Sequence, residues 1–295
     1  MREPWPSTPG IALRQVRYQL LLLWRTPIAM FFTIVLPLVM LVVFNLLFSG
    51  EDVETPAGQW PLSQFYTGSI AAFTAVSATF TNLANTIPIR REEGVMKRWR
   101  GTPVPRWTYL AGFVGSATLL ALAGSLLMIL FGVVFYDVEV EPAKMPAALA
   151  TFLIGVAAFS AMGIALGSLV PNANAAPAAA NAFILPLAFV SGIFIPLEDA
   201  PDWLTTVAGI FPLRPFATSV QDAFNPLVES PAFFPGRLAV VAAWGVAGAV
   251  AAAMWFRWSP KQADGRSASR RRRRASADAD AGAGTGGSSE VVREA

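Results

Sequence analysis

The sequence predicts an all-α membrane protein with six transmembrane helices. Hydrophobic residues make up 54% of the 295 residues and charged residues only 14%, well below the roughly 25% charged residues of an ordinary soluble domain. The apolar residues also gather in uncharged stretches long enough to cross a bilayer, which takes about 20 residues of helix. Basic residues separate these stretches in an alternating pattern, as they do in multi-pass membrane proteins.

Five uncharged stretches define the predicted spans. The longest, residues 145–197, has to fold back, because 53 residues of helix would run about 80 Å and one crossing needs about 30 Å. The turn is expected at residues 171–177, where two prolines and two asparagines occur together. The six predicted spans lie near residues 28–48, 65–87, 109–136, 147–170, 177–195 and 238–256.

Lysine and arginine predict the orientation of the spans. When both termini are placed on one side of the membrane, that side holds 19 of the 22 basic residues, and the other side keeps only Lys144, Arg214 and Arg237. Basic residues concentrate in cytoplasmic loops. Both termini and the loop between the second and third spans are therefore predicted to be cytoplasmic.

The first 27 residues are predicted to form a cytoplasmic segment with an amphipathic helix. Thr8 as the cap and Pro9 at the first helical position give a start signal, and apolar residues from Ile11 to Arg25 fall mainly on one face. We expect this helix to lie in the membrane interface and to end before Pro27. A simple cytoplasmic extension of the first span is the alternative.

The cytoplasmic loop after the second span is short, highly charged and bounded by Pro88 and Pro103. Val95, Met96 and Trp99 would give a short helix one apolar edge, which suits docking to a soluble partner. A basic loop that only sets the topology explains the same residues equally well.

The stretch after the fifth span is too rich in proline to cross the membrane and too apolar for a free loop. It is predicted to form a short helix from about Pro201 that is partly sunk in the outer interface. The remaining 38 residues, 258–295, have the composition of a disordered basic tail. Its five consecutive arginines, 270–274, could contact anionic lipid or remain in water.

Several kinds of chemistry are absent from the sequence. Without Cys or His, no Cys/His metal site and no nucleophile with a His base is available. No predicted span contains a charge, which disfavours a secondary carrier. The sequence also lacks the P-loop pattern, so the chain is not expected to hydrolyse nucleotide itself. No aromatic residues accompany the arginine-rich tail, and no nucleic-acid partner is expected.

Two segments in this order resemble the membrane subunits of type-2 ATP-binding-cassette (ABC) exporters, in particular the daunorubicin/doxorubicin-resistance permeases. The resemblance covers roughly residues 10–257. The first segment matches the family's loop pattern at Arg91, Glu93, Gly94, Met96, Arg98, Thr102 and Pro103. The second matches a pattern of serine, glycine, proline and tryptophan at Ser191, Gly192, Pro196, Glu198, Pro201, Trp203, Leu204, Pro212 and Leu213. Val95 and Lys97 depart from the pattern, because the family usually has Thr and commonly Glu there.

The resemblance implies a permease subunit of an ATP-driven exporter that moves a drug-like, lipid-like or other amphipathic substrate. A second permease subunit, identical or different, would pair with it, and a cytoplasmic ATPase would supply the ATP and magnesium, with no cofactor in this chain. A non-exporting membrane anchor or sensory partner of an ABC ATPase is the alternative. The 19 arginines against three lysines favour a GC-rich bacterial genome and hence the bacterial plasma (inner) membrane.

The resemblance also assigns site residues. Those expected to couple to the ATPase are Arg91, Glu92, Glu93, Gly94, Met96, Lys97, Arg98, Trp99, Thr102 and Pro103. The extracellular gate, formed by outer re-entrant helices, would include Ser191, Gly192, Pro196, Pro201, Trp203 and Pro212. Substrate would pass along spans one, two and five, where Phe31, Phe32, Asn45 and Phe73 are candidates for the path. No metal ligand or catalytic residue is expected.

Overall fold

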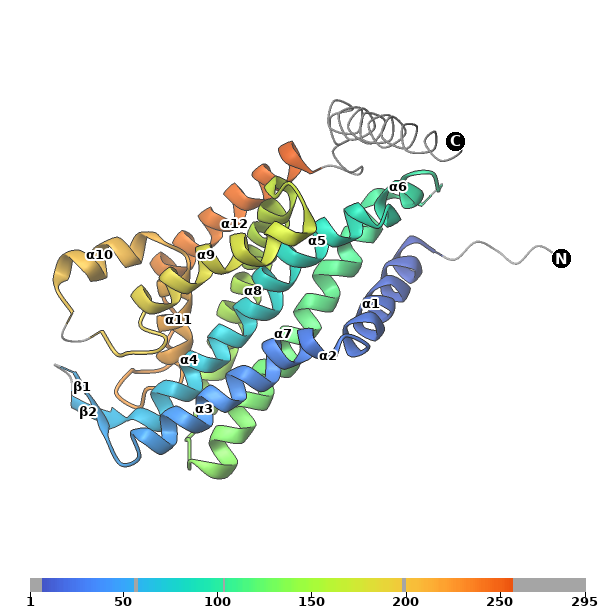
Figure 1. The fold of residues 1–295 in the computed structure, drawn as a ribbon. Coiled ribbons are helices and arrows are strands. Elements are labelled where there is room, and N and C mark those ends of the chain that lie inside the picture. The colour runs from blue at the N-terminus through green and yellow to red at the C-terminus, as the bar shows by residue number, and fades with distance from the viewer. Residues whose placement is uncertain (1–6, 56–57, 103, 198–199, 257–295) are drawn as a thin grey trace, which may run out of the picture. The chain divides into compact units, whose positions relative to one another are not determined.

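The computed structural model describes residues 7–256, except 56, 57, 103, 198 and 199 (Figure 1). Almost all of the described elements are helical. The first four are α1 (Thr8–Trp24), α2 (Pro27–Met30), the π-helix η1 (Phe31–Val35) and α3 (Leu36–Leu47). A hairpin of β1 (Asp52–Thr55) and β2 (Gly58–Pro61) follows, and then α4 (Leu62–Val76), the π-helix η2 (Ser77–Thr81), α5 (Asn82–Glu92) and α6 (Val95–Arg100).

All the regular elements in the second half of the described chain are helical. Its elements are α7 (Arg106–Phe135), the 3-10 turn η3 (Pro142–Lys144), α8 (Met145–Leu169), the 3-10 turn η4 (Ala173–Ala175), α9 (Ala176–Val190), α10 (Asp202–Ile210), α11 (Leu213–Gln221) and α12 (Pro235–Trp255). The predicted tail, residues 258–295, lies outside the described residues.

Helices lie at each of the six predicted span positions. Four segments are long and apolar enough to cross a membrane by length and composition: Trp107–Phe135, Pro142–Leu169, Ala173–Val190 and Pro235–Trp255. Phe31–Leu47, at the first predicted span, is a shorter apolar helix. The second predicted span lies in a helical run from Leu62 to Glu92 that contains a π-helical turn. The helical architecture of a multi-pass membrane protein is thus present.

The structure corrects several predicted boundaries. The helix α5 continues through Pro88 to Glu92, because its packing against α8 and α9 holds the backbone where proline removes a hydrogen bond. The fifth predicted span ends at Val190 rather than at residue 195, since Gly192 adopts a left-handed φ of 75°. The N-cap of α1 is Ser7, one residue before Thr8.

A two-stranded antiparallel hairpin was not predicted by the all-α interpretation. It pairs Val53 with Trp60, and both side chains are buried. Trp60 packs edge-on against Phe65 of α4, with ring centroids 5.9 Å apart. Because each strand has four residues and only one inward side chain, the alternation is too short to be recognised in the sequence. The hairpin lies at the opposite end of the helices from α6 (Figure 1).

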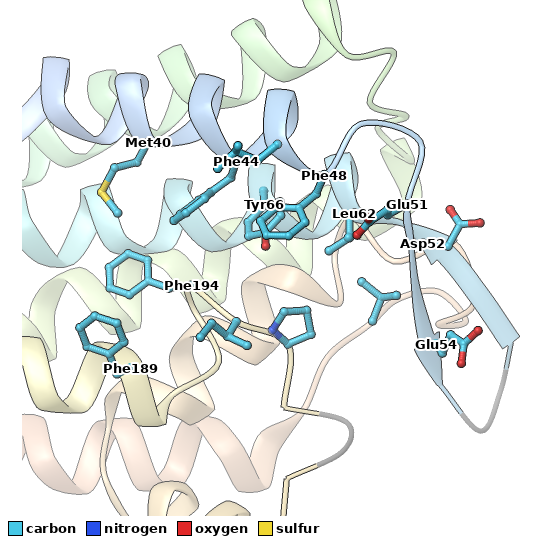
Figure 2. A pocket seen from close by; sticks show the side chains of 14 residues that line it. Met40, Phe44, Phe48, Glu51, Asp52, Glu54, Leu62, Tyr66, Phe189 and Phe194 are labelled. Carbon is cyan, nitrogen blue, oxygen red and sulfur yellow. The ribbon is translucent and has the colours of Figure 1, made fainter.

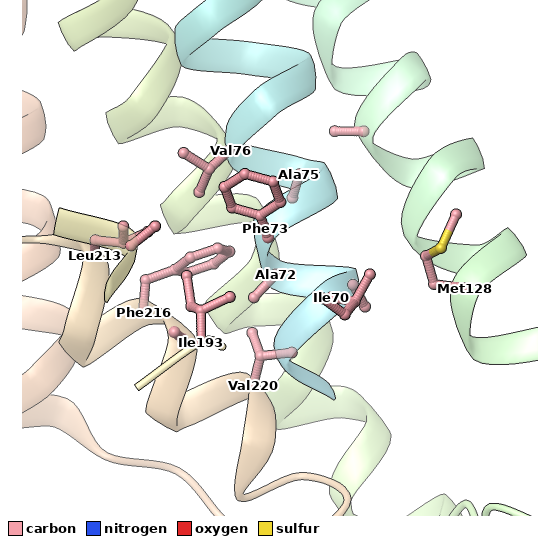
Figure 3. Packing of buried hydrophobic residues seen from close by; sticks show 14 of the residues in the cluster. Ile70, Ala72, Phe73, Ala75, Val76, Met128, Ile193, Leu213, Phe216 and Val220 are labelled. Atoms are coloured by element: carbon pink, nitrogen blue, oxygen red, sulfur yellow. The ribbon is translucent and has the colours of Figure 1, made fainter. Parts of the chain in front are cut away.

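The core is built where α4 meets α7, α8 and α11. Figure 3 shows Phe73 and Val76 of α4 facing Phe216 of α11 and Ile193, all of them buried. Small residues allow this close packing: a Cβ on Gly155 of α8 would lie 2.1 Å from the Phe216 ring. Gly163 and Gly167 of α8 pack in the same way against the helical run 77–92.

The N-terminal helix α1 packs lengthwise against α7. A Cβ at Gly112 of α7 would lie 2.6 Å from Gln15, and one at Gly115 would lie 2.7 Å from Val16. The opposite side of α1 exposes Leu13 and Trp24 together with three arginines, 14, 17 and 25. The outer face of the helix therefore mixes apolar and basic side chains, whereas the amphipathic prediction placed them on different faces. Its position in the membrane interface stays a prediction, and the helix ends before Pro27 as predicted.

Candidate functional site

The predicted coupling segment forms a helix–turn–helix at one end of the bundle. Gly94 joins α5 to α6 with a left-handed φ of 70°, a conformation that residues with a Cβ adopt only with strain. Met96 is fully buried, and the Trp99 ring packs on that of Tyr109 at 5.1 Å. The apolar edge of α6 therefore packs on the protein's own core, with Met96 buried and Val95 and Trp99 half-buried. This corrects the docking interpretation for Met96, which no partner can reach.

The polar residues of this segment remain on the surface. Glu92, Glu93, Lys97, Arg98 and Thr102 are all exposed. Arg90 donates to Glu93 at 2.8 Å, and the Thr102 hydroxyl donates to the carbonyl of Trp99 at 2.7 Å. Pro103 lies outside the described residues. The end of α5, the turn and α6 together consequently present charges of both signs, acidic at residues 92 and 93 and basic at Lys97 and Arg98.

Arg91 was predicted to contact the ATPase, but it is buried inside the bundle with 4% of its surface exposed. Its guanidinium donates to the carbonyls of Ser168 at 3.3 Å and Val170 at 2.5 Å, where α8 ends. The last carbonyls of a helix have no partner within it, and a cation there satisfies them. Arg91 is therefore a cap for α8 and is not available to a partner.

Glu92 makes a second link to the same turn. Its carboxylate accepts a hydrogen bond from the backbone N–H of Ala173 at 2.7 Å, three residues before α9 begins. Arg91 and Glu92 thus tie the end of α5 to both sides of the turn between α8 and α9. The identity of residues 91 and 92 alone gave no signal for this, because their partners are about 80 residues away and are backbone atoms.

The first two predicted gate residues, Ser191 and Gly192, lie in the turn that follows α9. The hydroxyl of Ser191 donates to the carbonyl of Leu187 at 2.5 Å. The carbonyl of Gly192 accepts from the side chain of Gln221 at 2.9 Å, and the same amide donates to the hydroxyl of Ser69 at 2.7 Å. These buried bonds connect the turn to α4 and α11.

The other gate residues lie along the helices that follow. Pro201 and Pro212 are the N-cap residues of α10 and α11, and Trp203 is exposed on α10. The predicted short helix from about Pro201 is therefore present. A second helix, α11, was expected only from the resemblance. One side of it is fully buried, at Leu213, Phe216 and Ala217.

A cavity of about 650 Å³ lies beside this turn, at the same end as the hairpin. It is lined by parts of α3, β1, α4 and α9 and by the turn after α9. Figure 2 shows the rings of Phe44, Phe48 and Tyr66 on one side of it and those of Phe189 and Phe194 on the other. Of the predicted gate residues, only Pro196 lines it.

The four residues proposed for the substrate path do not line this cavity. Phe31 and Phe32 are exposed on η1, with their rings edge-on at 5.5 Å. Asn45 is buried and donates to the carbonyl of Leu41 in its own helix at 2.8 Å. Phe73 is buried behind Phe194, with ring centroids 5.2 Å apart. Phe44 and Phe48, four residues apart on one helix face, were the signal that the sequence offered and that was missed.

Two basic residues at the cavity end are paired with acids. Lys144 is buried and donates to Glu141 at 2.7 Å and to the carbonyl of Asn225 at 2.9 Å. The hydrogen bonds from Lys144 and then Ser230 lower the pKa of the Glu141 carboxyl. Arg237 pairs with Asp222 at 2.5 Å, and burial raises the pKa of Asp222 while Arg237 acts against that shift.

No group of three or more His, Cys, Asp or Glu residues that could hold a metal ion occurs in the part of the chain that the structure describes.

Comparison with known proteins agrees with this architecture. Residues 14–225 match the sequence model of the family described as ABC-2 type transporter. "Putative transport permease YvfS" of Bacillus subtilis (strain 168) is 22% identical over 185 residues, which cover 63% of this chain and 75% of that protein. "Putative transport permease ycf38" of Cyanophora paradoxa is 29% identical over 196 residues, which cover 64% of this chain and 65% of that protein.

Proposed function

Because the chain belongs to the ABC-2 type transporter family, we propose that it is the membrane-spanning permease subunit of an ATP-driven exporter. It crosses the bacterial plasma membrane six times with both termini in the cytoplasm. A separate cytoplasmic ATPase binds ATP and magnesium and supplies the energy. A second permease subunit completes the membrane part, and the substrate is a drug-like, lipid-like or other amphipathic molecule.

The observation that carries this proposal is that α6 is held by a buried apolar side and exposes charged residues on its other side. Met96 and Trp99 pack the helix on a buried cluster that includes Tyr109 of α7, while Lys97 and Arg98 remain exposed. A helix that is anchored by its apolar side and presents charges can receive a protein partner without exposing its own core. This arrangement suits a docking helix better than a basic loop that serves only topology.

The links made by Arg91 and Glu92 provide a route from α6 into the bundle. They hold the turn between α8 and α9 to the end of α5. A displacement of α6 by the ATPase would therefore also move the start of α9. The other end of α9 carries Phe189 into the cavity, so the same helix connects the docking surface with the proposed path.

The position of the cavity fits a path along spans one, two and five. Its walls come from α3, α4 and the end of α9, which lie at these three predicted spans. Two packed states of a helix bundle can open and close such a path when a partner binds one of them better. In this proposal the hairpin and the turn after α9 form the outer boundary.

Co-purification with the ATPase encoded nearest to this chain tests the docking surface. The double variant Lys97→Gln plus Arg98→Gln should lose most of the ATPase bound by the wild type. The matched control is Arg14→Gln plus Arg17→Gln, which removes two exposed charges from the same predicted side of the membrane and should retain it. Equal retention by both double variants would contradict docking at α6.

ATP-dependent movement of substrate distinguishes an exporter from the alternatives. In inverted membrane vesicles that contain both proteins, an exporter accumulates substrate only when ATP is present. A membrane anchor or sensory partner binds the ATPase without transport. A secondary carrier transports in response to an ion gradient and needs no ATPase.

A further inference from the structure

The cavity at the hairpin end has the size and lining of a small-molecule site. Its volume of about 650 Å³ falls within the roughly 300–1,000 Å³ that is typical of ligand pockets. Hydrophobic side chains make up most of the lining, as they do in such sites. Neither wall is a single helix: residues from α3 and α4 face residues from α9 and the turn that follows it.

Five aromatic rings form the walls. Phe44 and Phe48 both stack on Tyr66, with centroids 4.9 and 5.9 Å apart. Across the cavity, Phe189 packs edge-on against Phe194 at 5.2 Å, and Phe194 reaches Phe44 at 6.3 Å. Ring faces carry a partial negative charge and attract cations within about 6 Å of the centroid. The walls therefore favour an apolar molecule and, among such molecules, a positively charged one.

All charged residues of the lining are acidic. They are Glu51, Asp52 and Glu54, which follow one another where α3 passes into β1. In Figure 2 the carboxylate of Glu51 lies beside Phe48 and Leu62, whereas those of Asp52 and Glu54 point away from the rings. Among the described residues Glu51 forms no salt bridge, and the basic residues Lys144 and Arg237 at this end already pair with other acids.

We propose that this cavity binds a lipophilic organic cation, with its apolar body between the aromatic walls and its charge toward Glu51. An organic anion would meet the Glu51 carboxylate and the negative faces of the rings. A hydrated divalent metal ion would need several oxygen ligands, which the apolar lining does not offer. This inference rests on the proposed function only where it names the transported substrate; the binding site itself does not depend on it.

Two ions of nearly the same size and shape test the charge preference. Tetraphenylphosphonium is a lipophilic cation, and tetraphenylborate is the corresponding anion. Equilibrium dialysis of each ion against the purified full-length chain in detergent, with protein-free micelles as the blank, measures binding to the protein alone. We expect saturable binding of the cation and at least tenfold weaker binding of the anion. Equal binding of both ions, or no saturable binding of the cation, would overturn the proposal.

Matched variants locate the site. Glu51→Gln should raise the Kd for tetraphenylphosphonium about three- to tenfold, the size expected for a partly exposed charge contact. Glu229→Gln, an identical change at an exposed residue outside the cavity lining, should leave the Kd unchanged. Phe189→Ala should also weaken binding, whereas Phe233→Ala, at a similarly exposed ring outside the lining, should not. Equal effects within either pair would place binding elsewhere.

The outcomes separate this inference from the proposed function. If the cation binds in a manner that depends on Glu51 but ATP never drives its movement, the site stands and the export proposal falls. If ATP drives export of a neutral or anionic substrate and Glu51→Gln does not change it, the export proposal stands and the cation site falls.

Discussion

The two ends of the helix bundle differ in where their charged and apolar side chains lie. At the α6 end, apolar side chains such as Met96 turn inward and the charges of Lys97 and Arg98 remain on the surface. At the hairpin end, Lys144 and Arg237 are bound to acids, and aromatic rings line an open cavity. The first end suits recognition of a charged protein surface and the second suits an apolar ligand. This difference fits a protein that receives energy at one end and handles substrate at the other.

The largest predicted effect comes from the buried arginine that joins the α6 end to the turn between α8 and α9. Arg91→Gln leaves the carbonyls at the end of α8 without their charged donor and should reduce the free energy of unfolding by about 3 kcal/mol. Arg90→Gln is the matched control, because its salt bridge with Glu93 is on the surface and contributes about 1 kcal/mol or less. Thermal unfolding in detergent compares the two variants, and equal losses would contradict the capping role.

Two neighbouring residues, Met96 and Lys97, represent the buried and the exposed side of α6. Met96→Ala should destabilise the protein by about 2–3 kcal/mol, because it leaves a space in a fully buried site. Lys97→Ala should change stability little and weaken ATPase binding instead. Unfolding and co-purification measured on both variants give opposite patterns if the helix is mounted as described. A loss of stability in Lys97→Ala equal to that in Met96→Ala would reverse this assignment.

The packing of α11 against α8 allows a third test. Gly155→Ala places a methyl group within 2.1 Å of the Phe216 ring, so the ring or the helix has to shift, at a cost of about 1–3 kcal/mol. Gly209→Ala is the control, since nothing lies within 4 Å of a Cβ there. Thermal midpoints measured in detergent should fall for the first variant only. If the two midpoints agree, α11 does not pack on α8 as observed.

The smallest effect is a difference in pH dependence between two acids at the hairpin end. The pKa of Glu141 is lowered below 4.5, so its contribution to stability is present above that pH and is lost as the pH falls through the folded-state value. The pKa of Asp222 is raised above 3.8, so stability decreases as the pH rises from 3.8 through its folded-state value. Glu141→Gln should remove the first dependence and Asp222→Asn the second. Thermal midpoints between pH 3 and 6 measure both, and slopes of the same sign for the two acids would be inconsistent with these shifts.

The sequence predicts the helices much better than the contacts between them. Long uncharged stretches placed helices at all six predicted positions, because apolar length is a local property. Arg91, by contrast, bonds to backbone atoms of residues 168–170, and no local pattern reports such a partner. Met96 was correctly recognised as part of an apolar edge, yet whether that edge faces a partner or α7 depends on the tertiary packing of Tyr109 and Phe113.

The cavity shows the same limit. Phe44 and Phe48 occupy one helix face, but lipid, core and ligand contacts all use such faces, so the sequence could not choose among them. The hairpin that carries Val53 to the cavity was not predicted, and the turn after α9 depends on Gln221, 29 residues beyond Gly192. A site built from three separate segments, here residues 40–54, 62–66 and 189–196, appears only when these segments are brought together.

A labelling measurement tests most directly whether energy received at α6 reaches the cavity. The chain has no cysteine, so Phe189→Cys provides a single thiol in the cavity wall, and Glu139→Cys, at an exposed residue outside the cavity lining, provides a reference. With the ATPase bound, the rate of labelling by a membrane-impermeant maleimide should change severalfold at position 189 when ATP is added and not at position 139. The change should disappear when Lys97→Gln and Arg98→Gln are also present. A rate at position 189 that is the same with and without ATP would contradict the account.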